Sequence, residues 1–360
     1  MNKDKIIGIE ISRDEINLAV LHKNNLGQIV VVDIKNIPVI NSERDKKLSD
    51  SNFYELIFKA VIELDLEGAQ VVFGSRNIPF IKQVEKFSRG TAKEDIYRKI
   101  SSLINSTHIF GRKLAKVSIK EDGAGINGIE SVLPVAFFCI SDDIITQIMD
   151  IAAGVSLKLV DIDIVQIAIL RVLIHEKSLY NDYFLSVVIE DDCLDLNIVV
   201  KNKIVFTRSI AINQFGAFDE EDMQDGMLQK IKHFLIAYSN FYPKMKLPDR
   251  AVFFSRSEEN KGLLKFVFDN LDSDFECELV SKISIFDPDL MKDFGSVELF
   301  RFSAAIGVSL KVLEDIDVGN SFIEVSKRAR KKGFDFFVKT VGFLLVFIFV
   351  LCGVGLLFVN

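Results

Sequence analysis

The stretch LSVVIEDDCLDLNIVVKNKIVFTRSI, residues 185–210, decides the fold. Alternating and β-branched residues fill three runs, 183–189, 194–200 and 204–210, and short polar turns separate these runs. Such runs are typical of consecutive antiparallel strands. The stretch therefore predicts a three-stranded meander.

The opening of the chain repeats this order. Residues 6–20 and 28–34 alternate in the same way around a turn at 23–27 and predict a hairpin, and residues 52–64 then have helical spacing. In the second half, helical spacing over 227–238 again follows the strands. Two halves with one order of elements indicate a duplicated α/β fold.

Between the two repeats, strands alternate with helices, as in an α/β domain. Isoleucines four residues apart mark 89–106 as an amphipathic helix, and Gly154 lies where a second helix is expected to end. We expect further strands at 69–73, 132–140, 157–162 and 250–254, and further helices at 141–153, 165–175 and 263–270.

The composition excludes several classes of protein. The 360 residues carry 44 basic and 51 acidic side chains, a net charge of −7, which does not attract nucleic-acid phosphates. The four cysteines form no CxxC pair and the four histidines have no HxxxH or HExxH spacing. Asp161 and Asp163 share one face of a strand without indicating a pocket. We therefore expect no nucleic-acid partner, no metal site, no disulfide framework and no catalytic residue.

The C-terminal run VGFLLVFIFVLCGVGLLFV, residues 341–359, contains no charged side chain. As a helix it would be ~28 Å long, which matches a bilayer core of about 30 Å. A buried core helix is the alternative, but no polar residue interrupts the run. The sequence predicts a membrane anchor that includes Val341, Leu344, Phe347, Leu351, Leu356 and Val359.

A basic run precedes this predicted span and consists of Lys327, Arg328, Arg330, Lys331 and Lys332. Positive residues beside a span stay on the cytoplasmic side, where they contact lipid headgroups. Charges interrupt the N-terminal stretch MNKDKIIGIEISRDE, so it is not expected to be a signal peptide. We expect a single-pass membrane protein with a cytoplasmic N-terminal domain.

Several strings in a fixed order resemble PilM, the actin-like cytoplasmic protein of type IV pilus assembly, and more distantly the cytoplasmic part of the type II secretion protein GspL. The resemblance covers about residues 5–312. The strings are IGIEISRDEINLAVL at 7–21, the strand and helix at 71–104, AAGVSLKLVDIDIVQIAILR at 152–171, the meander with Phe-Thr-Arg at 206–208, and FSAAIGVSLK at 302–311.

The resemblance implies a two-domain actin-like fold, which is a duplicated ribonuclease H-like α/β fold with a small inserted subdomain and a nucleotide cleft between the halves. The expected parts are a first half at 1–178 with the insertion at about 78–140, a second half at 179–312, a basic linker at 313–335 and a transmembrane helix at 336–360.

The three loops that hold nucleotide in actin-like ATPases are degraded in this sequence. Such loops need glycine, because backbone N–H groups approach the phosphates closely. The resemblance places Glu10 at the family's acidic residue, but Ser12 stands where glycine is expected. Three acidic residues at 190–192 occupy the second loop. The third loop follows the strand expected at 250–254, and the next glycine there is Gly262. We expect no enzyme activity and no cofactor, while weak ATP binding stays open.

The resemblance implies a non-catalytic scaffold on the bacterial inner membrane that serves type IV pilus biogenesis or type II secretion. Its expected partners are PilN-, PilO- or GspM-like membrane proteins and the assembly ATPase. The alternative is a membrane-attached, filament-forming actin-like ATPase resembling FtsA. FtsA attaches by an amphipathic helix, whereas residues 341–359 are apolar all round, which favours a true span.

The segment IDVGNSFIEVSKRARKKG, residues 316–333, together with the span that follows, resembles the cytoplasmic tail and membrane helix of PilN. In the PilM family the partner is a short PilN peptide, bound in a groove beside the inserted subdomain. We hypothesise that PilM-like and PilN-like parts are fused here, so that a contact between two chains is made within one. A plain anchor with a basic flank is the alternative.

Overall fold

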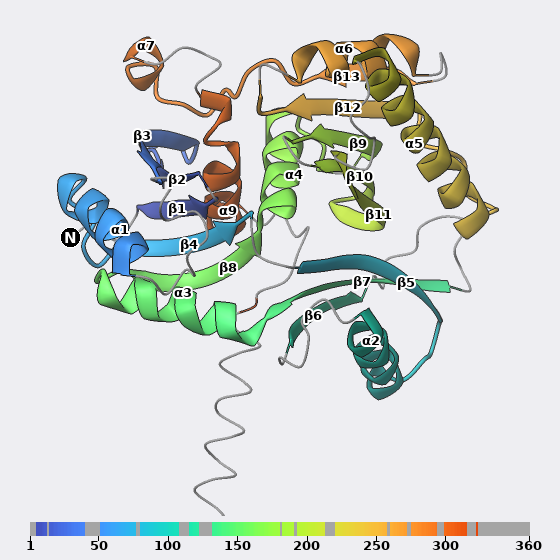
Figure 1. Cartoon of the computed structure of the whole chain (residues 1–360), viewed down its shortest axis with the longest axis horizontal. Helices are drawn as coiled ribbons and strands as arrows, with labels where there is room; N and C mark the ends of the chain where they lie inside the picture. The colour runs from blue at the N-terminus through green and yellow to red at the C-terminus, as the bar shows by residue number, and fades with distance from the viewer. Residues whose placement is uncertain are drawn as a thin grey trace, which may run out of the picture.

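The computed structural model shows two α/β halves side by side, with a smaller unit of sheet and helix against them (Figure 1). It describes residues 5–12, 14–39, 51–76, 80–107, 115–121, 132–180, 182–190, 193–212, 220–257, 260–271, 275–293, 299–314 and 322. The predicted span at 341–359 and the basic run at 327–332 lie outside these residues. Within the described ranges, no helix is both long enough and apolar enough to cross a membrane.

The first half contains a five-stranded sheet in which a meander is extended by two parallel strands. Its strands lie in the order β3 (Ile29–Pro38), β2 (Glu15–Lys23), β1 (Ile6–Ile11), β4 (Gln70–Ser75) and β8 (Lys158–Ile164). Its helices are α1 (Ser51–Glu63), α3 (Asp142–Gly154) and α4 (Val165–Glu176).

The strand predicted at 6–20 is in fact two strands, β1 and β2, joined by a tight turn. The N–H of Ser12 donates to the carbonyl of Glu15 at 2.9 Å, and the hydroxyl of Ser12 accepts from the N–H of Glu15 at 3.1 Å. Because a serine hydroxyl satisfies this turn, it needs neither glycine nor proline. The first meander therefore has three strands, like the second.

The second half repeats the topology of the first. Its strands lie in the order β11 (Lys203–Ala211), β10 (Cys193–Val200), β9 (Tyr183–Ile189), β12 (Arg250–Ser255) and β13 (Glu276–Leu279), and its helices are α5 (Glu220–Phe241) and α6 (Lys261–Asn270). In both sheets the first strand of the meander pairs in parallel with the strand that follows it in the sheet order. The predicted duplication of an α/β fold is confirmed.

The smaller unit is an insertion in the first half, and we call it the inserted subdomain. Its sheet has the order β5 (Phe80–Ser88), β7 (Val132–Ser141) and β6 (Ala115–Glu121). Helix α2 (Lys93–Thr107) covers one face of this sheet through Ile96, Ile100 and Ile104, as their spacing predicted. The strands β5 and β6 of this sheet were not expected from the sequence.

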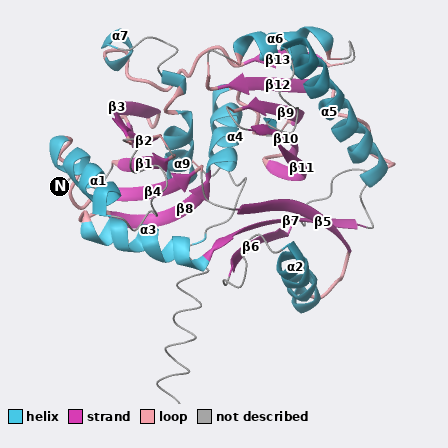
Figure 2. Cartoon of the chain, viewed as in Figure 1, coloured by secondary structure: helices cyan, strands magenta, loops and turns pink. Residues whose placement is uncertain are grey.

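Helix α9 (Ser303–Leu313) follows the short helix α7 (Leu290–Asp293) in sequence and packs on α4 and on β1, β2 and β4 of the first half. Figure 2 shows α4 and α9 standing between the two large sheets. Two glycines allow α9 to pack closely: a Cβ at Gly8 would lie 1.7 Å from the carbonyl oxygen of Ala305, and one at Gly307 would lie 2.0 Å from that of Ala168. A single hydrophobic core contains residues of both halves and of the inserted subdomain.

Candidate functional site

The candidate site lies between the halves, where the resemblance implies a nucleotide cleft. The carboxyl ends of β4 and β12 both point toward the middle of the molecule there (Figure 1). Four charged side chains meet there: Glu10, Arg76, Glu190 and Arg256. Glu10 lies on β1 and Glu190 directly follows β9, while the arginines directly follow β4 and β12. None of the four side chains is more than 12% exposed. We call them the cleft network.

Two of the three ion pairs in the cleft network cross from one half to the other. Arg256 of the second half donates from Nη1 to Oε1 of Glu10 at 2.6 Å. Arg76 of the first half forms an ion pair from Nη2 to Oε2 of Glu190, and its Nε lies 3.7 Å from Oε1 of Glu10. Each half therefore supplies one glutamate and one arginine, and the charges balance within the cleft.

Glu10 is fully buried and stays charged because of its neighbours. Burial by itself would raise the pKa of Glu10. The charges of Arg256 and Arg76 and the hydrogen bonds from Arg256 and Asn17 outweigh burial, so the pKa lies below its ordinary value. The amide of Asn17 donates to Glu10 at 3.3 Å and to Glu15 at 2.8 Å.

The two arginines occupy equivalent positions in the two halves. Residues 73–76 read Phe-Gly-Ser-Arg and residues 253–256 read Phe-Phe-Ser-Arg. Ser75 pairs with Ile11 in the first sheet, and Ser255 pairs with Ile189 in the second, so each arginine follows the same register position. The sequence analysis missed this repeated Phe-x-Ser-Arg, although the string itself was a signal that could have been found.

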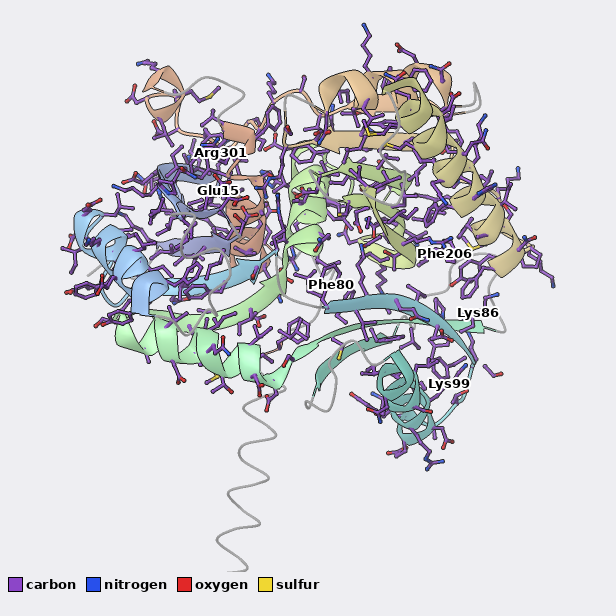
Figure 3. All side chains as sticks on the ribbon, viewed as in Figure 1. Glu15, Phe80, Lys86, Lys99, Phe206 and Arg301 are labelled. Carbon is purple, nitrogen blue, oxygen red and sulfur yellow. The ribbon has the colours of Figure 1, made fainter. Side chains whose placement is uncertain are left out.

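Glu15, the first residue of β2, lies beside the cleft network. Its carboxylate accepts from the amides of Asn17 and Asn36 at 2.8 Å each, and Arg301 lies 3.4 Å away (Figure 3). Arg13 and the second and third acidic residues of the 190–192 loop lie outside the described residues.

Asp161 and Asp163, the pair on β8, each have a cationic partner. The buried Asp163 forms an ion pair with Arg171, whose Nη1 also donates to the carbonyl of Gly307 at 3.2 Å. Asp161 Oδ2 lies 2.9 Å from Nζ of Lys311. Both aspartates therefore join helices α4 and α9 to the sheet. Within the part of the chain that the structure describes, no three His, Cys, Asp or Glu side chains could hold a metal ion.

Phe322 is the one described residue beyond Glu314, and its side chain is only 1% exposed. It belongs to the core shared by both halves and the inserted subdomain. Its backbone N–H donates to Oδ1 of Asp161 at 3.1 Å. The segment hypothesised to dock on the domain thus contains a residue that is buried in it.

The end of α9 is held by a second polar cluster. Oε1 of Glu314 lies 2.8 Å from Nδ1 of His175, at hydrogen-bond distance. Oε2 of Glu314 accepts a hydrogen bond from the hydroxyl of Tyr180 at 3.2 Å. Burial by itself would lower the pKa of His175, but the hydrogen bond and charge of Glu314, together with Glu176, outweigh burial and raise it. Glu314 therefore fixes the end of α9 to His175 at the end of α4.

The anchor residues Val341, Leu344, Phe347, Leu351, Leu356 and Val359, and the basic residues Lys327, Arg328, Arg330, Lys331 and Lys332, all lie outside the described residues. Their predicted roles stay predictions.

No protein-family model matches the sequence, and no curated protein matches it either. Several solved structures are similar to this chain. A chain of the PilM-PilN type IV pilus biogenesis complex is similar with a TM-score of 0.57 and 16% identity, over 86% of this chain and 98% of that chain.

Two other solved structures have lower TM-scores. The cytoplasmic domain of EpsL, an inner membrane component of the type II secretion system of Vibrio cholerae, has a TM-score of 0.40 and 10% identity, over 84% of this chain and 94% of that chain. A Bacteroides thetaiotaomicron protein with an actin-like ATPase fold and unknown function has a TM-score of 0.40 and 10% identity, over 77% of this chain and 91% of that chain. The chain has the PilM-like, actin-like fold that its sequence strings resemble, as the similarity to the PilM-PilN structure shows.

Proposed function

We propose that the protein is a non-catalytic, actin-like scaffold of an inner-membrane assembly platform of the type IV pilus or type II secretion kind. The cleft network carries this proposal. Actin-like ATPases hold phosphates at the hairpin turns of this cleft, and the residues there must be free to meet an anion. Here Arg76 and Arg256 are paired with buried glutamates of the opposite half.

Like charges argue against a triphosphate in the cleft. A nucleotide would have to displace Glu10 or Glu190 from an arginine, which leaves a buried carboxylate without its partner. The acidic residues of the second loop would add to this repulsion. The cleft therefore serves to join the halves.

A titration with magnesium ATP tests the non-catalytic part of the proposal. A ligand at about 100 times its dissociation constant adds ~2.7 kcal/mol to the stability of the folded state. We expect the melting temperature of the full-length protein in detergent to be the same with magnesium ATP as with magnesium alone. A rise in the melting temperature, or release of phosphate, would support the FtsA-like ATPase instead.

The membrane location of this scaffold rests on the sequence. The apolar run 341–359 would span the bilayer, and the basic run 327–332 would lie at the cytoplasmic headgroups. The domain would then stand on the cytoplasmic face, where PilN-, PilO- or GspM-like proteins and an assembly ATPase can reach it.

The fusion of PilM-like and PilN-like parts is the finer part of this proposal. The burial of Phe322 and its hydrogen bond to Asp161 support docking of the 316–333 segment on its own domain. Because Lys311 pairs with the same carboxylate, Asp161 links the end of α9 to the docked residue.

Replacing Phe322 by alanine is expected to release the docked segment. Truncation of a fully buried phenylalanine lowers the free energy of unfolding by about 3 to 5 kcal/mol. The loss cannot exceed the free energy that holds the segment on the domain, because the segment can detach locally. We expect a lower melting temperature and faster proteolysis between residues 314 and 341 of the full-length protein, and the same from deletion of 315–324. Phe58→Ala, at a position that is 39% exposed on α1, is the control. Unchanged melting and cleavage in both Phe322 variants would refute docking.

A further inference from the structure

The sheet of the inserted subdomain has two covered faces. Ile81 and Phe87 of β5 pack against α2. The alternate residues Lys82, Val84 and Lys86 point the other way, because side chains along a strand alternate between faces. This second face meets the second half, where β11 lies next to β5 (Figure 1). Two lysines on a covered face are unusual, since an ammonium group loses its hydration there.

Lys82 meets a polar patch on the second half. Its side chain is 1% exposed, and its Nζ donates to Oδ1 of Asp195 at 2.5 Å and to Oδ1 of Asn197 at 3.0 Å. Asp195 and Asn197 lie on one face of β10 and are fully buried. Ser209 and Thr207, opposite them on β11, donate to Asp195 at 2.5 Å and to Asn197 at 2.7 Å.

This patch is built to receive one cation. The carboxylate of Asp195 also accepts from the amide of Asn197 at 2.7 Å, so the surrounding donors hold it in place for the lysine. A buried carboxylate without a counter-charge is strongly unfavourable. Asp195 therefore needs Lys82, which comes from a different part of the chain.

Lys86 meets a second cation site, at the end of α5. Its Nζ donates to the carbonyl of Phe241, the last residue of that helix, where the helix dipole is negative. The same Nζ lies 3.8 Å from the ring centre of Phe241 and 5.0 Å from that of Tyr242, over both rings. Burial lowers the pKa of Lys86. Figure 3 shows Lys86 on β5 and, for contrast, Lys99 on α2.

We propose that the inserted subdomain is a lock that holds the two halves closed. The ion pairs of the cleft network join the halves in the middle of the molecule, and β5 of the inserted subdomain fastens them a second time through Lys82 and Lys86. Two halves joined at one place can swing open, whereas halves joined at two separated places cannot. The cleft therefore stays closed unless β5 leaves β10 and α5.

The lock does not depend on the proposed scaffold function. It concerns motion between parts of the chain, whereas the ATP titration concerns what the cleft binds, so the two proposals fail separately.

Hydrogen exchange of the full-length protein in detergent tests the lock. We expect Lys82→Met to speed amide exchange at least about tenfold in both β5 and β10–β11, since an interface that opens exposes both of its sides. Exchange in α4 should not change. Lys99→Met is the matched control, because Lys99 lies on the same subdomain and is 52% exposed. Exchange in Lys82→Met that equals the wild type, or that rises in β5 alone, would overturn the proposal.

Two further variants cover the case in which Lys82→Met does not fold. Lys86→Met removes the contact of β5 with the end of α5 and leaves no buried carboxylate unpaired. It should therefore raise exchange in β5 and at the end of α5. The double variant Lys82→Met with Asp195→Leu replaces the ion pair by apolar side chains and should restore slow exchange, since such replacements are often neutral or stabilising. Unchanged exchange in Lys86→Met would show that the contact of Lys86 with α5 does not hold β5 in place, and would overturn the lock.

Discussion

Replacing Gly307 by alanine is expected to lower the free energy of unfolding by about 3 kcal/mol or more, near the upper end for overpacked cores. The added Cβ would lie 2.0 Å from the carbonyl oxygen of Ala168 and 2.4 Å from its carbonyl carbon. These are backbone atoms of α4, so no side chain can rotate away. Helix α9 would have to move, together with the hydrogen bond from Arg171 to the carbonyl of Gly307.

Urea unfolding of the full-length protein, followed by circular dichroism, measures this effect. Val312→Ala is the control, since Val312 lies on α9 and is 36% exposed. Its midpoint should stay near that of the wild type. A Gly307→Ala midpoint that matches the Val312→Ala midpoint would contradict the close packing of α4 on α9.

Replacing Arg256 by alanine is expected to cost about 3 to 5 kcal/mol, as for other buried ion pairs that lose one partner. Glu10 would remain fully buried, with Arg76 at 3.7 Å as its remaining cation. Adding Glu10→Gln to this variant should recover part of the loss, because the uncompensated charge is then gone. Arg301→Ala is the control: Arg301 is 51% exposed and pairs with Glu15, so its loss should cost below about 1 kcal/mol.

The pH dependence of the same variants gives a second readout. The folded-state pKa of Glu10 lies below its ordinary value of 4.5. The stability that the network contributes is therefore present above that value and is lost as the pH falls through the folded-state pKa. In Arg256→Ala the pKa of Glu10 should rise, so stability should be lost at a higher pH than in the wild type. Equal acid unfolding curves for the wild type and Arg256→Ala would contradict the cleft network.

The meanders could be predicted from the sequence because β-branched or alternating residues fill β2, β3, β9, β10 and β11 and polar turns separate these strands. The predicted hairpin around residues 23–27 is confirmed by the antiparallel pairing of β2 with β3, but the break within its first strand was missed for a local reason. The turn from Ser12 to Glu15 contains no glycine, proline or asparagine, and a serine hydroxyl replaces the usual turn chemistry. The repeated order of elements was then enough to give the duplicated fold.

The candidate site could be predicted only in part. The Phe-x-Ser-Arg strings mark Arg76 and Arg256, but nothing local shows that each pairs with a glutamate of the other half. The same holds for β10, whose alternation puts Asp195 and Asn197 on one face. Alternation alone assigns a polar face to solvent, and only the tertiary structure shows that Lys82 covers it. Pairings between distant parts of a chain depend on packing and not on local pattern.

We propose that this chain works by binding inner-membrane assembly proteins. The most direct test is mass spectrometry of what co-purifies with the tagged full-length protein from detergent-solubilised native membranes. The account predicts recovery of PilN-, PilO- or GspM-like membrane proteins, with or without an assembly ATPase. Recovery of cell-division proteins instead, or of no membrane protein above an untagged control, would contradict the scaffold function.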